Sequence, residues 1–278
     1  MPKLLEGYNV TSKFLYCEPD GHFPNHHPDP TVPKYLEDLI KEVREGSYDV
    51  GIAYDGDADR IGVIDEKGDI VWGDRLLIIF SRDILSRNKG AKIIFEVKCS
   101  QTLIEAIEKA GGVPVMWKTG HSLIKSKMKQ EGALLAGEMS GHIFFNDRYY
   151  GFDDAIYASL RLLEILSARK VSLSNLLADV PHYFSTPEIR IDFSDKEKFE
   201  VVKRLTDYFR QKHKVIDIDG VRVLFEEGWG LVRASNTQPI LVLRFEAKTQ
   251  EALKAITDEV TQAIHAVSGR TIDLGGYL

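Results

Sequence analysis

The sequence predicts an α/β protein that ends in an α+β domain, and two features indicate this. Up to residue 181, short apolar strands alternate with helical segments, a pattern typical of α/β units with largely parallel sheets. After residue 181, three strands follow one another closely between two charged amphipathic helices, which is typical of an α+β domain. A chain of 278 residues has room for two or three domains, and we expect a boundary near 181–186.

The α/β part is expected to contain a helix that Thr31 caps and Gly46 ends, followed by short strands on both sides of an acidic loop. In chain order, the predicted helices span 31–46, 74–88, 100–112, 122–132 and 151–170. The predicted strands span 13–19, 49–55, 61–66, 91–97, 113–119 and 133–139, with a turn at 66–69.

The two ends of the chain carry further expectations. In the C-terminal part, the pattern predicts strands at 185–193, 221–227, 228–235 and 239–248, and helices at 195–213 and 250–267. At the other end, residues 2–7 predict a helix of under two turns before the first strand. A crossover between parallel strands needs about 10–12 residues or more. We therefore expect the chain to start inside a domain; a short N-terminal helix is the simpler alternative.

Composition excludes several classes of protein. The net charge of -6 argues against broad nucleic-acid binding, so no nucleic-acid partner is expected. No apolar run approaches the roughly 20 residues of a membrane span, and the N-terminus lacks a signal-peptide pattern. Only two cysteines are present, too few for a disulfide framework, which predicts a reducing cytoplasm.

The acidic loop "DGDADR" places Asp55, Asp57 and Asp59 at every second position, followed by Arg60. Two such charges about 4 Å apart repel by roughly 4 kcal/mol at a surface-like dielectric. A bound cation removes that cost, so we favour an oxygen-only Mg²⁺ site, with Arg60 serving a ligand's anionic oxygens. Two alternatives remain open. One is a calcium loop of the EF-hand type, against which stand Arg60 at the glycine position and the strand flanks. The other is a solvated turn.

Two later motifs offer polar groups to a ligand. "GEMSGH" alternates Glu138, Ser140 and His142, which would project on one side of an extended segment and suit neighbouring sugar hydroxyls. "RASNTQP" combines Arg233 with small polar residues and backbone N–H groups, an arrangement that suits a phosphate. For the first motif an ordinary polar turn is the alternative, and for the second a turn between strands.

Single residues at the ends of predicted strands are further candidates. Lys98 in "FEVKCS" and "KTGHS", from Lys118 to Ser122, both follow strands, where α/β sheets place their ligands. A surface or capping role is the alternative for each. His26 and His27 in "NHHPDP" offer metal ligands, although adjacent histidines more often line a loop.

The motifs "DGDADR", "KTGHS", "GEMSGH" and "RASNTQP", in this order, resemble the α-D-phosphohexomutase family, specifically its bacterial phosphomannomutase/phosphoglucomutase branch. The resemblance covers essentially the whole chain and implies two phosphohexomutase-type α/β domains, the first incomplete, before the α+β domain. It assigns residues 1–69 to part of family domain 2 with the metal loop. It assigns 70–181 to domain 3 with the sugar loop, and 182–278 to domain 4 with the phosphate loop.

The resemblance also implies a role for each matching residue. Mg²⁺ is expected at Asp55, Asp57 and Asp59. Catalytic roles are implied for Arg60, Lys98 and His121, with Lys98 a candidate proton-transfer partner. Substrate binding is implied for Lys118, Glu138, Ser140, His142, Arg233, Ser235, Asn236 and Thr237. In the family, a phosphoserine exchanges its phosphoryl group with a hexose 1- or 6-phosphate. A hexose 1,6-bisphosphate is the intermediate, and glucose 1,6-bisphosphate activates the full-length enzyme.

The chain departs from the family in one respect. The family's active serine lies in a Ser-His-Asn-Pro-like motif, and no serine is directly followed by histidine in this sequence. We therefore expect domain 1 to be missing and the isolated chain to be inactive. A phosphosugar- and Mg²⁺-binding module without turnover is the competing hypothesis, and a metal-dependent phosphatase lacks a nucleophile. The sequence does not choose between glucose and mannose phosphates.

Overall fold

The computed structural model describes residues 1–278 except 19, 275 and 278, and it divides into two compact units. The first unit comprises Met1–Phe95, Leu103–Val115 and Gly120–Asp179. The second comprises Glu96–Thr102, Met116–Thr119 and Val180–Leu278. Both are mixtures of helices and sheets, as the sequence predicts. Among the described helices, none is long and apolar enough to cross a membrane.

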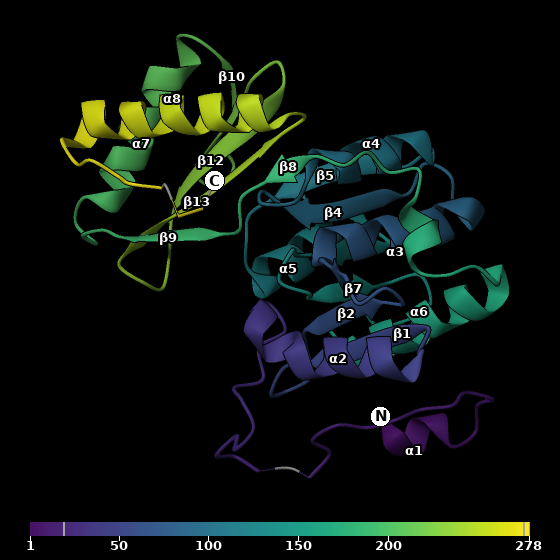
Figure 1. Ribbon diagram of the computed structural model, residues 1–278. Coiled ribbons are helices and arrows are strands. Elements are labelled where there is room, and N and C mark those ends of the chain that lie inside the picture. The colour runs from purple at the N-terminus through teal and green to yellow at the C-terminus, as the bar shows by residue number, and fades with distance from the viewer. Residues whose placement is uncertain (19, 275, 278) are drawn as a thin grey trace. The chain divides into compact units, whose positions relative to one another are not determined.

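The first unit opens with a small antiparallel sheet and one covering helix. The elements in chain order are α1 (Pro2–Leu5), η1 (Pro33–Leu36), α2 (Glu37–Gly46), β1 (Val50–Tyr54), β2 (Ile61–Asp65) and β3 (Ile70–Val71). The strands pair in the order β1-β2-β3. Leu36, Val43 and Ile64 form a small core where α2 lies against this sheet (Figure 1).

Two expectations near the N-terminus are wrong. Residues 13–18 form no strand, and Tyr16 has a left-handed φ of 54°, which interrupts the extended backbone; residue 19 of that predicted strand lies outside the described residues. Thr31 does not cap the helix, because its N–H and its hydroxyl both donate to Asp29 Oδ1, at 3.0 and 2.7 Å. The helical segment begins instead as a 3-10 turn at Pro33. Its end at Gly46 is as predicted.

The rest of the first unit is built on a second sheet with the strand order β5-β4-β6-β7. Its strands are β4 (Lys92–Glu96), β5 (Val113–Trp117), β6 (Leu135–Gly137) and β7 (Ile143–Phe145). The helices are α3 (Gly73–Arg87), α4 (Gln101–Lys109), α5 (His121–Glu131), α6 (Ala155–Arg169) and the short η2 (Ser174–Leu177). The last residues of β4 and β5 belong to the second unit.

The expectation of largely parallel sheets is wrong for most of the strand pairs. β4 and β6 are parallel, but β1–β2, β2–β3 and β6–β7 are antiparallel. The connections explain this, since the loops after β1 and β6 are far shorter than the 10–12 residues of a parallel crossover. β7 itself was not predicted. α6 starts four residues later than expected because Asp154 caps it, accepting from the Tyr157 N–H at 2.8 Å.

The second unit has a six-stranded antiparallel sheet against which two helices pack (Figure 1). Its elements are β8 (Phe184–Ser185), β9 (Ile189–Asp192), α7 (Lys198–Arg210), β10 (Lys214–Ile216), β11 (Val221–Leu224), β12 (Gly228–Ala234), β13 (Ile240–Ala247) and α8 (Gln250–Ser268). The path runs β10-β11-β12-β13-β8, and β9 also pairs with β13. Phe209, Phe245 and Val260 lie in its core. The α+β character predicted for this part is confirmed; β10 was not predicted.

Candidate active site

The acidic loop connects β1 to β2 and folds around Asp55. The N–H groups of Asp59 and Arg60 donate to Asp55 Oδ1 at 3.1 and 3.0 Å, and Arg60 Nε donates to Oδ2 at 2.7 Å. Ala58 has a left-handed φ of 59°, which closes the turn. Asp55 is buried, whereas Asp57 is exposed. Asp55 is thus the internal anchor of the loop, and Asp57 points to solvent.

The three aspartates offer a compact set of oxygen ligands. One carboxylate oxygen from each of Asp55, Asp57 and Asp59 lies within 4.8 Å of the others. Oxygen-only ligands match the preference of Mg²⁺, so the donor set fits the ion that the sequence suggests. The strands on both sides of the loop are not the helices that flank an EF-hand loop. The magnesium assignment stays a prediction.

The "GEMSGH" motif forms the tight turn between β6 and β7. Glu138 N–H donates to the His142 carbonyl at 2.9 Å, so the segment is not extended, contrary to expectation. Gly141 has a φ of 99°, and a Cβ there would lie 2.3 Å from the Ile61 carbonyl oxygen. Only glycine therefore allows this turn to approach β2 so closely.

Main-chain contacts join this turn to the acidic loop. Ile61 N–H donates to the Gly141 carbonyl at 3.1 Å, and Arg60 and His142 form an antiparallel bridge. The first unit thus holds the aspartates and the "GEMSGH" side chains next to each other through backbone contacts.

Glu138, Ser140 and His142 converge although their segment is folded. His142 Nδ1 lies 2.9 Å from Glu138 Oε2 and 3.1 Å from Ser140 Oγ. The other oxygen of Glu138 accepts from the Gly120 N–H at 2.6 Å, which ties the turn to the start of α5. A carboxylate, a hydroxyl and an imidazole therefore line one small region, as the motif predicts.

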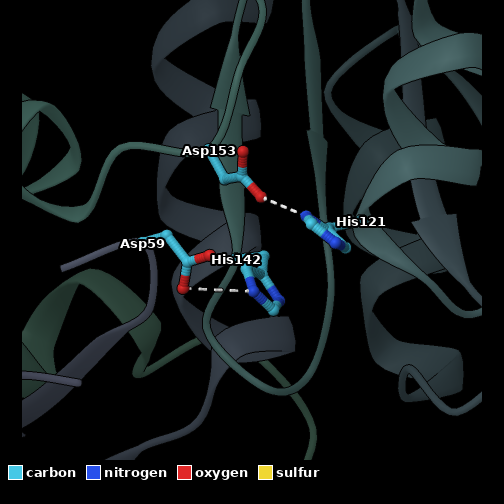
Figure 2. A group of neighbouring side chains, drawn as sticks. All are labelled: Asp59, His121, His142 and Asp153. Carbon is cyan, nitrogen blue, oxygen red and sulfur yellow. Dashed lines mark hydrogen bonds and ion pairs between the residues drawn. The ribbon is translucent and has the colours of Figure 1, made fainter. Parts of the chain in front are cut away.

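A four-residue group, here called the His–Asp cluster, lies beside them and consists of Asp59, His121, His142 and Asp153. His142 Nε2 lies 3.3 Å from Asp59 Oδ1, and His121 Nδ1 lies 3.0 Å from Asp153 Oδ2, as Figure 2 shows. The two imidazole rings stack with centroids 5.5 Å apart. Lys125 Nζ binds the second Asp153 oxygen at 2.8 Å. Asp153 was not foreseen, because the sequence pattern placed it inside a long helix.

Burial and charge shift the acidities in this region. Burial would raise the pKa of Asp55, but the hydrogen bonds from the Arg60 main chain and guanidinium outweigh burial and lower that pKa. Burial raises the pKa of Asp59, and the neighbouring carboxylates add to the effect. Burial would lower the pKa of His142, yet the hydrogen bond to Glu138 and the surrounding negative charges raise it. The region therefore favours bound positive charge.

In the second unit, Arg233 on β12 is buried and already has a carboxylate partner. Its Nε donates to Asp219 Oδ2 at 3.0 Å, and the same oxygen accepts from the Thr119 N–H at 3.1 Å. Gly220, with a φ of 81°, lets the β10–β11 turn approach, since a Cβ there would lie 2.6 Å from the Arg233 Cβ. Among the described residues, the terminal nitrogens of Arg233 have no acceptor and remain available to an anion.

The remainder of "RASNTQP" forms the turn between β12 and β13. The buried Ser235 hydroxyl accepts from the N–H groups of Thr237 and Gln238 at 3.3 and 3.2 Å. The expectation of free backbone N–H groups is therefore wrong for these two. Asn236 and Thr237 are exposed, so their side chains are open to solvent.

Lys98 is buried among carboxylates of the second unit. Its Nζ lies 2.8 Å from Glu188 Oε2 and 3.7 Å from Glu96 Oε1, and its carbonyl accepts from Arg244 Nη1 at 2.7 Å. Lys118 is exposed on the segment after β5. Asp219 and Glu188 carry no local motif, so sequence reasoning had no signal for them.

The adjacent histidines near the N-terminus form no metal-capable group in the described part of the chain. His26 Nδ1 lies 2.9 Å from the His27 carbonyl, and the His26 ring stacks on Tyr35 at 5.5 Å. They line a loop, as the alternative interpretation holds.

Three phosphoglucomutase/phosphomannomutase family models match the chain in succession. They are alpha/beta/alpha domain II at residues 1–68, alpha/beta/alpha domain III at 72–184 and the C-terminal domain at 188–263. The chain belongs to the α-D-phosphohexomutase family. This confirms the resemblance that the four motifs indicate.

Individual phosphohexomutases are also similar to this chain over most of its length. The phosphomannomutase/phosphoglucomutase of Pseudomonas putida is 56% identical over 92% of the chain and 56% of its own length. The phosphoglucomutase of Neisseria gonorrhoeae is 49% identical over 95% of the chain and 58% of its own length. A crystal structure of a phosphoglucomutase/phosphomannomutase family protein from Burkholderia thailandensis has a TM-score of 0.85 at 45% identity. The match covers 93% of this chain and 55% of that one. The chain thus spans little more than half the length of these relatives.

Proposed function

We propose that this chain carries the metal-, sugar- and phosphate-binding parts of a hexose-phosphate mutase that interconverts the 1- and 6-phosphates of glucose or mannose. The observation that carries the proposal is the backbone pairing of the acidic loop with the "GEMSGH" turn. Ile61 N–H to the Gly141 carbonyl, at 3.1 Å, fixes the two loops side by side. A phosphoryl-transfer site needs this kind of positioning more than covalent help from the protein.

The acidic loop is assigned to the reacting phosphate. Asp55, Asp57 and Asp59 would hold Mg²⁺, which supplies positive charge beside the transferring phosphoryl group. Arg60 is held by Asp55 and by Asp29, whose Oδ1 accepts from Nη1 at 3.0 Å. Arg60 is therefore oriented before any ligand arrives, and it would bind the anionic oxygens of the phosphoryl group.

The "GEMSGH" turn is assigned to the sugar. Glu138 and Ser140 would accept and donate hydrogen bonds to neighbouring hydroxyls, with His142 next to them. His121 and Lys98 are assigned to the reaction, Lys98 as a partner in proton transfer, and Lys118 to substrate binding. Glucose and mannose differ only in configuration at C2. A site that binds the other hydroxyls and makes no contact at C2 would accept both sugars.

The "RASNTQP" turn is assigned to the phosphate that does not react. The free terminal nitrogens of Arg233 suit bidentate binding of a phosphate. Ser235, Asn236 and Thr237 complete this clamp. A clamp of this kind holds either end of a bisphosphate, as an intermediate that turns around between two transfers requires.

The two transfers need a phosphoserine. The proposed route passes through a hexose 1,6-bisphosphate, with glucose 1,6-bisphosphate as activator, and no Ser-His pair occurs within these residues. The proposal therefore includes a phosphoserine-bearing N-terminal domain outside these 278 residues. The same absence favours the second candidate, a phosphosugar- and Mg²⁺-binding module without turnover.

We also propose that the protein is cytoplasmic and has no nucleic-acid or membrane partners. We propose that the chain consists of three domains, at residues 1–69, 70–181 and 182–278. The limits of the three family models, 1–68, 72–184 and 188–263, support the division.

Calorimetry tests the proposed function directly. Glucose 1-phosphate is titrated into the chain in the presence of Mg²⁺, with glycerol 3-phosphate and free glucose as controls. We expect the sugar phosphate to bind more tightly than either control, since free glucose lacks the phosphate and glycerol 3-phosphate lacks the sugar ring. Equal affinity for glycerol 3-phosphate would contradict the sugar assignment.

A further inference from the structure

The His–Asp cluster has the ligands of a metal site that differs from the acidic loop. It brings one ligand atom from each of Asp59, His121, His142 and Asp153 within 4.8 Å of one another. The residues come from four separate stretches of the first unit, and Figure 2 shows the carboxylates and imidazoles facing each other in pairs. Two nitrogens and two oxygens are a mixed donor set, whereas the acidic loop offers oxygen alone.

One imidazole of the cluster is already oriented in the way that metal sites require. Glu138 Oε2 lies 2.9 Å from His142 Nδ1, and a carboxylate at that distance fixes the proton on Nδ1. In the neutral form of the ring, Nε2 is then the nitrogen that can bind a metal ion. That atom faces Asp59 Oδ1 at 3.3 Å, so a metal ion that displaces the proton between them can bind both.

We propose that the His–Asp cluster is a binding site for a zinc-class divalent cation. Two imidazole nitrogens and two carboxylate oxygens suit Zn²⁺, whereas Mg²⁺ prefers oxygen ligands alone. Lys125 occupies only Oδ1 of Asp153, so Oδ2 is the oxygen that faces His121.

The cluster needs little rearrangement to bind the ion. With metal–ligand bonds of about 2.1 Å, a tetrahedral site has edges of about 3.4 Å. The contacts of 3.0 and 3.3 Å already match two edges. The four ligand atoms lie within 4.8 Å of one another, and rotation of His121, whose side chain is half exposed, can bring its nitrogen closer to the others.

The cluster shares Asp59 with the acidic loop, and this makes the two sites competitors. An ion in the cluster withdraws one carboxylate from the oxygen-only site and places like charge beside it. It also engages His142, which the proposed function assigns to the sugar region. Zinc-class ions would therefore oppose both Mg²⁺ and sugar phosphate.

The test measures metal binding by the 278-residue chain and does not depend on mutase activity. Co²⁺ is added as a spectroscopic probe of four-coordinate nitrogen and oxygen ligation, and the Zn²⁺ affinity is measured against a chromophoric chelator. We expect His121→Gln to weaken Zn²⁺ binding at least about 100-fold, because even residues behind metal ligands cost 10–100-fold when replaced. Asp57→Asn should leave Zn²⁺ affinity within about threefold, because Asp57 is outside the cluster.

Two further variants control the experiment. His22→Gln alters a surface histidine that lies 2.9 Å from Asp20, so it reports on loss of an unrelated His–Asp pair and should change nothing. Asp153→Asn should weaken Zn²⁺ binding as His121→Gln does, and thermal unfolding of each variant monitors the fold. Unchanged Zn²⁺ affinity in His121→Gln would overturn the proposal. So would an equal loss in Asp57→Asn, because it would place the ion in the acidic loop.

Discussion

The acidic loop and the Arg233 region differ in how their charged side chains are paired. Around the acidic loop, carboxylates face one another or an imidazole, and Asp55 is the aspartate that a guanidinium neutralises. In the second unit the two buried functional cations already have carboxylate partners: Asp219 for Arg233, and Glu188 for Lys98. The carboxylates of the acidic loop outnumber the guanidinium that binds them, whereas the two buried cations of the second unit are already paired with carboxylates.

The difference shows what each region is prepared to bind. Clustered carboxylates are costly until a cation arrives, so the first region is suited to a metal ion. A buried cation without a partner is more costly still, and internal carboxylates make Arg233 and Lys98 tolerable in the free protein. An entering phosphate must then use the terminal nitrogens of Arg233 that Asp219 leaves free.

The largest expected effect is the absence of mutase activity in the isolated chain. Both regions are proposed to bind ligands, but no Ser-His pair like that of the family's phosphoserine motif occurs in the sequence. The proposed route depends on a covalent phosphoenzyme, which divides one difficult step into two easier ones. The measurement is a coupled assay of glucose 1-phosphate conversion with Mg²⁺ and glucose 1,6-bisphosphate.

The control for that assay adds the phosphoserine-bearing N-terminal part of a full-length relative, fused or in trans, which should restore turnover. Turnover near 1 s⁻¹ by the isolated chain, an ordinary enzyme rate, would contradict the expectation. Ser100, Ser122 and Ser140 would then be the first candidates for carrying the phosphate.

The next largest expected effect is on stability, and it comes from the ion pair between Glu188 and Lys98. Burial would raise the pKa of Glu188, but the Lys98 charge and hydrogen bond, with help from Arg190, lower it to about 2 from 4.5. A lowered pKa stabilises the fold above pH 4.5, and that stability is lost as pH falls towards 2. The shift corresponds to roughly 3 kcal/mol near neutral pH.

Urea unfolding of the protein and of Glu188→Gln, near pH 7 and near pH 3, tests this linkage. The variant should be less stable by roughly 3 kcal/mol near neutrality, and the gap should narrow in acid. Glu226→Gln, at an exposed carboxylate of the same unit, should show no such gap. If the difference in unfolding free energy between the protein and Glu188→Gln stays constant with pH, the Lys98–Glu188 ion pair is not its source.

Arg233→Ala removes the proposed phosphate clamp. Hydrogen bonds to charged groups contribute roughly 1.5–3 kcal/mol each, so hexose-phosphate binding should weaken at least about tenfold. Free glucose binding should barely change, because it does not use the clamp. Calorimetry with both ligands measures this, and Arg204→Ala on the exposed side of α7 is the matched control. Equal losses for both ligands would place the phosphate elsewhere.

The same comparison shows what the sequence could reveal. The four motifs predicted candidate sites at the acidic loop, the "GEMSGH" turn and Arg233, because their spacing along the chain is local information. Asp153, Asp219 and Glu188 were missed, since each becomes a partner only when distant segments fold together. Strand direction was misjudged after β1 and β6, although the short loops there already exclude parallel crossovers.

The smallest expected effect is that of replacing Asp57, which is exposed, compared with replacing Asp55, which is buried. Asp57 is exposed and accepts no hydrogen bond among the described residues, so Asp57→Asn removes a metal ligand without disturbing the fold. Mg²⁺ binding, which we expect to be weak without a phosphoserine ligand, should fall several-fold with unchanged unfolding behaviour. Asp55→Asn instead loses the charged acceptor of Arg60 and should cost about 2 kcal/mol of stability as well.

Calorimetry with Mg²⁺ and urea unfolding distinguish the two outcomes, with Asp49→Asn, just before β1, as the control for a nearby surface charge. Unchanged Mg²⁺ binding in Asp57→Asn would remove the magnesium assignment. Loss of stability in Asp57→Asn would show that its carboxylate serves the fold. The contrast between an anchoring and a ligating aspartate would then no longer hold.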